Sequence, residues 1–190
     1  MQQLRTHRIV LFTVVLGLFA GQFNRIDAVS ATEPAAPVTI HDADAATTEF
    51  IDWSVARYVD AGLELPNLEF FVHPDRDACD GHKGYWHPGR TADRVDICAA
   101  TESLILHEIA HAWDHHSVTD ETRDAFMALY PDDEWEDDHV GHFAQGIERF
   151  AEAVAWGLGS NPIPADNVDA LVERIELFEM ITGFASPRLP

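Results

Sequence analysis

The chain has 190 residues, with 12 lysine and arginine residues against 33 aspartate and glutamate residues, and a formal net charge of −21. So large an acidic excess argues against nucleic acid and against anionic membrane surfaces as partners, because both carry negative charge. The length suits one domain with a hydrophobic core rather than several domains.

The first 31 residues have the three-part layout of a secretory signal peptide. Arg5 and Arg8 form a basic start, residues 9–20 are almost wholly apolar, and small residues lead to Ala31. We therefore expect cleavage after Ala31 and a secreted protein without stable membrane insertion. The alternative is a retained membrane anchor through residues 9–20, although this run is shorter than the about 20 residues that span a bilayer.

The mature chain is interpreted as a tether followed by one domain. Residues 32–42 are rich in proline and alanine and predict the tether, and residues 43–190 predict the single domain. Cys79 and Cys98 are the two cysteines of the chain. A lone pair in an exported protein usually forms a disulfide, so we predict a Cys79–Cys98 bond.

Apolar periodicity, caps and turn residues predict an α+β fold, with short strands before the helix at 102–116. The expected elements, in chain order, are a helix at 43–61, a strand at 68–72, a hairpin at 84–98, and helices at 102–116, 120–129, 143–158 and 166–182. Thr101 is the expected N-cap of the 102–116 helix, and residues 131–141 form an acidic loop. We expect a small mixed sheet and hairpin packed on the 102–116 helix, followed by a mainly helical C-terminal half.

The sequence His107-Glu108-Ile109-Ala110-His111 is an H-E-x-x-H motif within the predicted 102–116 helix. Residues four apart lie one turn apart on the same helix face, so His107 and His111 can bind one metal ion. Glu108 is placed to act as a general base. This combination is typical of zinc hydrolases.

A catalytic zinc site needs a third protein ligand, and the 143–158 helix offers two glutamates one turn apart. Both cannot easily bind the metal directly. We assign Glu148 as the ligand and Glu152 as the acceptor that orients a ligand histidine through its second ring nitrogen. The alternative for this pair is a solvated helix face.

The run from His107 to Asp114, followed by Glu148-Arg149-Phe150-Ala151-Glu152-Ala153, resembles the gluzincin metallopeptidases. It looks most like the catalytic domain of the anthrax lethal factor type, and the resemblance covers about residues 100–158. It implies zinc as the cofactor, Glu148 as the third ligand, and Glu152 as its outer neighbour.

In that family a tyrosine shortly before the glutamate ligand stabilises the oxyanion, and this chain lacks it. We expect a histidine to donate that hydrogen bond instead, with His142 preferred, His139 in reserve, and Tyr85 as the next candidate. Of the other polar residues, His115 and His116 are interpreted as helix-end groups, and Asp114 either orients a ligand histidine or is exposed. The histidines of the strand and hairpin region are interpreted as surface groups; they are His73, His82 and His87.

These observations predict a secreted zinc metallopeptidase that acts on a peptide or protein substrate. The strand at Val95–Cys98 is the expected place for an extended peptide to add to the sheet. Two alternatives stay open: an exported zinc-binding protein without peptidase activity, and a helical domain whose motif arose by chance.

Overall fold

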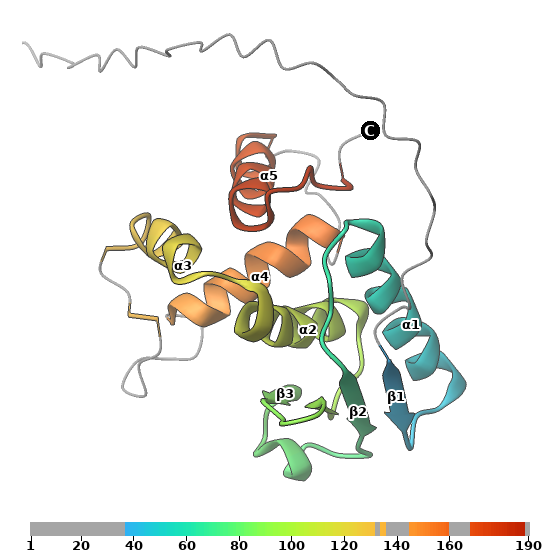
Figure 1. Ribbon diagram of the computed structural model, residues 1–190. Helices are drawn as coiled ribbons and strands as arrows, with labels where there is room; N and C mark the ends of the chain where they lie inside the picture. The colour runs from blue at the N-terminus through green and yellow to red at the C-terminus, as the bar shows by residue number, and fades with distance from the viewer. Residues whose placement is uncertain (1–36, 132–133, 136–144, 160–167, 189–190) are drawn as a thin grey trace, which may run out of the picture. The chain divides into compact units, whose positions relative to one another are not determined.

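The computed structural model describes residues 37–131, 134–135, 145–159 and 168–188. The strands are β1 (Val38–His41), β2 (Leu68–Val72), β3 (Gly84–His87) and β4 (Asp93–Ile97). The helices are α1 (Ala45–Asp60), η1 (a 3-10 turn, Asp77–Cys79), α2 (Glu102–Ser117), α3 (Asp120–Met127), α4 (Gly146–Leu158) and α5 (Val168–Thr182). The predicted α+β class is confirmed, with the sheet before a helical C-terminal half (Figure 1).

The four strands form one mixed sheet in the order β1-β2-β4-β3. β1 and β4 both run parallel to β2, whereas β3 and β4 form the predicted antiparallel hairpin. The prediction that a peptide adds to the strand at Val95–Cys98 is wrong, because β4 is hydrogen-bonded to a neighbour on both sides. Within the part of the chain that the structure describes, β3 is the strand of this hairpin that lies at the edge of the sheet.

The tether predicted for residues 32–42 differs from the structure at its C-terminal end. Val38–His41 form β1, which pairs in register with β2 through Val38 opposite Leu68. Val38, Thr39 and Ile40 are β-branched residues that favour a strand, and α1 provides the crossover that a parallel pair requires. The preceding prolines made this short strand look like part of a linker.

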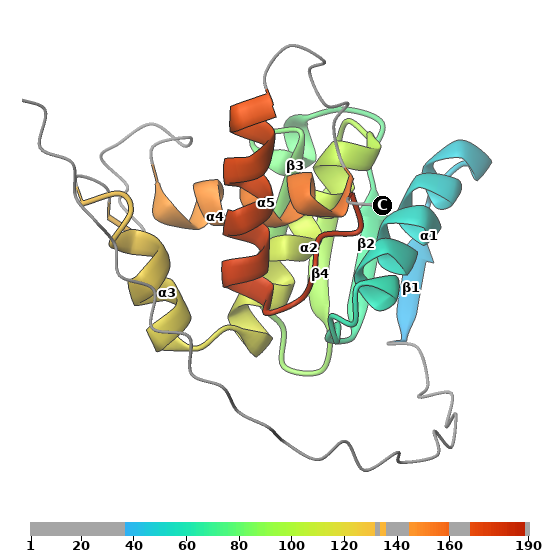
Figure 2. The same cartoon turned by 90° about the horizontal axis from the view of Figure 1, so that it is seen from above.

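Helix α2 is the central element of the hydrophobic core. It contacts β3 and β4 on one side and α1 and α4 on others, and Figures 1 and 2 show it between the sheet and α4. Its apolar side chains Ile105, Leu106 and Ile109 are fully buried. The Tyr58 hydroxyl of α1 donates a hydrogen bond to the Leu106 carbonyl oxygen at 2.7 Å. Burial of this face fixes the rotation of α2 about its axis and therefore the direction of its remaining side chains.

Helix α4 packs against α2, and α5 covers the other side of α4 (Figure 2). α4 ends at Gly159, whose φ of 116° is a left-handed conformation that glycine adopts readily. Along the α4–α5 contact, Gly157 lies directly against Phe178, where an added Cβ would come within 2.2 Å of the ring. The two helices therefore approach closely at this point.

The predicted disulfide is confirmed, and Cys79 of η1 is bonded to Cys98, directly after β4. The amides of Cys98 and Ala99 both donate hydrogen bonds to the carbonyl oxygen of Lys83, just before β3. The bond thus joins the segment that leads into β3 to the segment that leads into α2. Among the described residues, no helix is long and apolar enough to cross a membrane. The predicted signal peptide lies outside the described residues.

The first prediction concerns this disulfide. Replacing both cysteines with alanine should lower the free energy of unfolding by about 3 kcal/mol, because the bond closes a loop of about 20 residues. Urea denaturation of both proteins measures the difference, and the wild type under reducing conditions should shift by a similar amount. Two thiols that react with an alkylating agent in the native, non-reduced protein would contradict the bond.

Candidate metal centre

The H-E-x-x-H motif lies in the middle of α2, as predicted. The hydroxyl oxygen of Thr101 accepts a hydrogen bond from the Leu104 amide at 3.2 Å and caps the helix. With the apolar face of α2 buried in the core, His107 and His111 lie one turn apart on the side facing α4. Glu148 projects toward them from the first turn of α4 and is 7% exposed.

Three potential ligands converge between the two helices: His107, His111 and Glu148. The Nε2 atom of His107 lies 3.0 Å from Oε2 of Glu148 and 3.2 Å from Nε2 of His111, and His111 Nε2 lies 3.4 Å from Oε1 of Glu148. Two ligands bound tetrahedrally to one zinc ion at about 2.05 Å are about 3.3 Å apart. The three separations therefore fit a single metal ion held by two imidazoles and a carboxylate.

Glu152 lies on the far side of His107 from the three potential ligands. Its Oε2 atom is 3.7 Å from Nδ1 of His107, the ring nitrogen that faces away from the three-atom cluster. Burial alone lowers the pKa of His107, but hydrogen bonds to Glu148 and Glu152 outweigh it and raise that pKa to about 10. In the absence of a metal ion, a proton on His107 balances the buried carboxylate.

Glu108 is buried beside the cluster, against the first residue of the edge strand. A Cβ at Gly84 would lie 2.7 Å from Oε1 of Glu108, so only glycine leaves room for this carboxylate. Burial raises the pKa of Glu108 to about 7, and the negative charge of Glu148 contributes in the same direction, although His107 opposes it. A carboxyl group with such a pKa can accept and return a proton near neutral pH.

The cluster opens into a cleft of about 560 Å³, between β3 on one side and the start of α4 on the other. Gly84, Tyr85 and Trp86 of β3 line one wall, and Gln145 and Ile147 line the opposite wall. Glu108, His111 and Glu148 form part of its lining. The candidate metal site is thus open to a ligand that lies along the edge strand.

Trp86 connects the cleft to a polar network that sequence reasoning missed. Its ring stacks beside that of His111, with centroids 6.2 Å apart and planes 22° apart. Its indole N–H donates to Oδ2 of Asp93 at 2.9 Å, and the Asp93 carboxylate also contacts Nε2 of His116 at 3.1 Å. Asp93 is 1% exposed, so this carboxylate fixes the edge strand against the end of α2. His116 is therefore held by a carboxylate.

The opposite face of the sheet holds a second buried carboxylate, Asp96. It accepts two hydrogen bonds from Arg94 at 2.7 Å and contacts His73 at 2.5 Å and His87 at 3.3 Å. Burial alone would raise the pKa of Asp96, but the contacts with Arg94 and His73 outweigh it and lower that pKa. His73 and His87, expected as simple surface histidines, thus hold a buried acid. The alternation of polar and apolar residues in β4 indicated that Arg94 and Asp96 lie on the same face of the sheet.

The remaining candidates fall into two groups. Asp114 is buried, with 3% of its surface exposed. It accepts a hydrogen bond from Arg123 at 2.9 Å, and this bond joins α2 to α3. His115 is exposed at the end of α2 and packs beside Trp86. His139 and His142, the predicted oxyanion donors, lie outside the described residues.

The ligand assignment leads to a second prediction. Glu148→Ala should abolish tight zinc binding, because it removes one of three converging ligands, whereas Glu152→Ala should weaken binding by about 10- to 100-fold. Glu152→Gln keeps an acceptor for the His107 N–H and should cost less than Glu152→Ala. Competition with a chelating dye measures all three dissociation constants. The reverse order for Glu148→Ala and Glu152→Ala would show that the two roles are exchanged.

A third prediction concerns protons. Because the pKa of His107 is raised to about 10, its ring is protonated at neutral pH in the metal-free protein and must lose that proton to bind zinc. Zinc binding at pH 7.5 should therefore release about one proton, and affinity should rise about tenfold per pH unit between pH 6 and 8. Calorimetry in two buffers with different ionisation enthalpies counts the protons. An affinity that is constant over this range would contradict the proton-for-metal exchange.

No family model, no curated protein and no solved structure matches the chain. The interpretation of the site therefore depends on its geometry and chemistry. That geometry is a buried set of two histidines and a glutamate, beside a buried glutamate with a raised pKa, in a cleft along a strand edge.

Proposed function

We propose that this protein is a secreted zinc-dependent peptidase of gluzincin type. The observation that carries the proposal is the convergence of His107, His111 and Glu148 within ligand distance of one another, with Glu108 beside them in an open cleft. Two nitrogen ligands, one oxygen ligand and a neighbouring free carboxylate are the donor set of a catalytic zinc site.

When bound, a zinc ion supplies a Lewis acid that polarises a carbonyl group and lowers the pKa of water to about 7. Glu108 accepts the proton of the attacking water and returns it to the amine that leaves, for which its raised pKa is suitable. Glu152 lies 3.7 Å from Nδ1 of His107, where its negative charge favours a proton on Nδ1 and leaves Nε2 directed toward the cluster.

The edge of β3 supports peptide as the substrate. Its backbone groups on the side away from β4 can pair with an extended chain, as in other cases of strand addition. A peptide in this position runs along the cleft and brings a carbonyl group to the three ligands. The oxyanion donor stays a proposal: His142 or His139 remains preferred, and Tyr85, which lines the cleft, is the alternative within the described residues.

The fourth prediction tests the base. Glu108→Gln should keep zinc content near that of the wild type and lower the cleavage rate by at least about 100-fold, since an amide cannot accept the proton. Gly84→Ala should also reduce the rate with zinc retained, because the new Cβ would displace the same carboxylate. Mass spectrometry of a diverse peptide mixture, incubated with each zinc-loaded protein, measures cleavage, and metal analysis measures zinc.

Full activity in Glu108→Gln would exclude this mechanism. Stoichiometric zinc binding with no cleavage of any peptide by the wild type would instead support the exported zinc-binding protein without peptidase activity. A protein that binds no zinc would overturn both proposals and favour a structural helical domain.

A further inference from the structure

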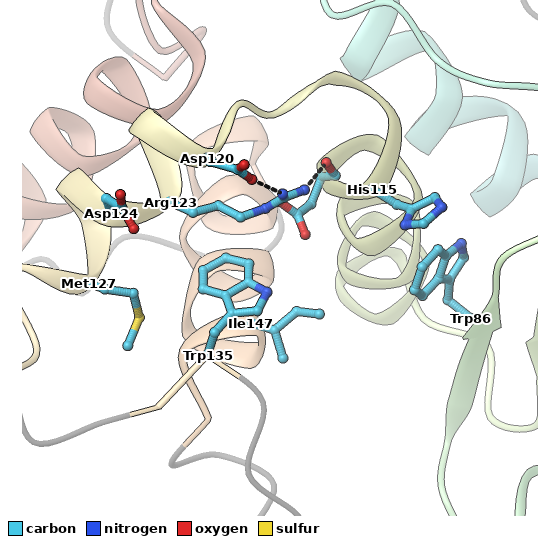
Figure 3. A pocket seen from close by; sticks show the side chains of 9 residues that line it. Trp86, His115, Asp120, Arg123, Asp124, Met127, Trp135 and Ile147 are labelled. Carbon is cyan, nitrogen blue, oxygen red and sulfur yellow. Dashed lines mark hydrogen bonds and ion pairs between the residues drawn. The ribbon is translucent and has the colours of Figure 1, made fainter.

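A second cavity, of about 410 Å³, lies beside the metal cleft, at the C-terminal end of α2. The two cavities share Trp86 and Ile147 as lining residues, so these side chains separate the metal cleft from the second cavity. Figure 3 shows Trp86 beside His115 on one side of this cavity, and Ile147 next to Trp135 on another. We call this cavity the side pocket.

Four of the residues that line the side pocket are apolar, and one of these four is held rigidly. Trp86, Met127, Trp135 and Ile147 offer flat or flexible apolar surface. The Trp86 ring cannot easily swing away, because its N–H is bonded to the buried carboxylate of Asp93 at 2.9 Å. A methylene chain of several carbons would lie well between such walls.

The polar lining of the side pocket is predominantly acidic. It contains Asp114, Asp120 and Asp124, and the other polar groups of the described lining are the imidazole of His115 and the guanidinium of Arg123. Arg123 donates two hydrogen bonds to Asp114, at 2.9 Å to the carboxylate oxygen Oδ1 and at 2.8 Å to the carbonyl oxygen. It donates a third to the carboxylate of Asp120 at 3.2 Å. Figure 3 shows it reaching from α3 to the end of α2.

Asp124 lies one turn after Asp120 on α3 and is exposed. It forms no ion pair with another described residue. The three aspartates of the lining therefore carry more negative charge than Arg123 neutralises. An anionic group would be repelled here, and a cation would be attracted.

We propose that the side pocket is a specificity site that takes a lysine or arginine side chain of the substrate, next to the bond presented to the metal. The aliphatic part of that side chain packs between Trp86 and Trp135, and its charged end reaches Asp120 and Asp124. This inference rests on the proposed peptidase function for its biological meaning, but the pocket can be tested by binding alone.

The probes are pairs of short peptide hydroxamates that chelate zinc and carry either lysine or the uncharged norleucine on one side of the chelating group. Calorimetry measures their affinity for the zinc-loaded full-length mature protein. The lysine probe of one pair should bind about three- to tenfold more tightly than its norleucine partner, which is what two ion pairs with exposed carboxylates contribute at most. The Asp120→Asn, Asp124→Asn double variant should remove this ratio and leave norleucine binding unchanged.

A matched control removes the same charge elsewhere. Glu49→Gln with Asp52→Asn changes two exposed acids of α1 and should keep the lysine preference, which separates a local contact from the overall acidic charge. Equal affinity for both probes of every pair, or no binding of any probe, overturns the side pocket as a lysine or arginine site. A lysine preference without cleavage of any peptide upholds the pocket and overturns the peptidase instead.

Discussion

The burial of the Glu148 carboxylate between α2 and α4 is the interaction on which the site depends. A carboxylate in this position is stable only with positive charge beside it, because burial strongly disfavours an isolated ion. Two imidazole nitrogens face it at 3.0 and 3.4 Å, and one proton on His107 provides the charge in the metal-free protein. A divalent cation would meet the same requirement more fully. The same three side chains therefore join α2 to α4 and form the candidate metal site.

The edge strand β3 contacts the motif residues of α2 from the side opposite α4. Gly84 leaves space for the carboxylate of Glu108, and Trp86, held by Asp93, lies against His111. All three contacts involve the β3–β4 hairpin, whose connection to the start of α2 is held by the disulfide. The edge strand is thus positioned relative to the ligands by a hydrogen bond, a steric fit and a covalent bond, each independent of the others. These three constraints together fix the shape of the cleft wall that the edge strand forms.

Much of the fold follows from local patterns. The bounds of α2 were predictable because Thr101 caps it and its apolar residues recur at helical spacing, and the hairpin followed from the turn residues between β3 and β4. That His107 and His111 lie on one face was predictable because the motif limits its own geometry, whereas Glu148 was assigned from its one-turn spacing to Glu152 and from the family resemblance. β1 was missed because a strand of four residues next to prolines carries little signal until its parallel partner is known. The contacts of Asp93 and Asp96 were missed for a related reason: each joins different elements of the fold, and no local periodicity encodes such pairs.

The contact between Gly84 and Glu108 has a consequence for finding distant relatives of this chain. An H-E-x-x-H motif by itself is too short to indicate common ancestry. A glycine at the start of an edge strand, 24 residues before the motif glutamate, is required by the volume of that carboxylate and is independent of the motif. Divergent sequences that keep both this glycine and a glutamate 41 residues after the first histidine would share a spatial arrangement, even where overall similarity has been lost.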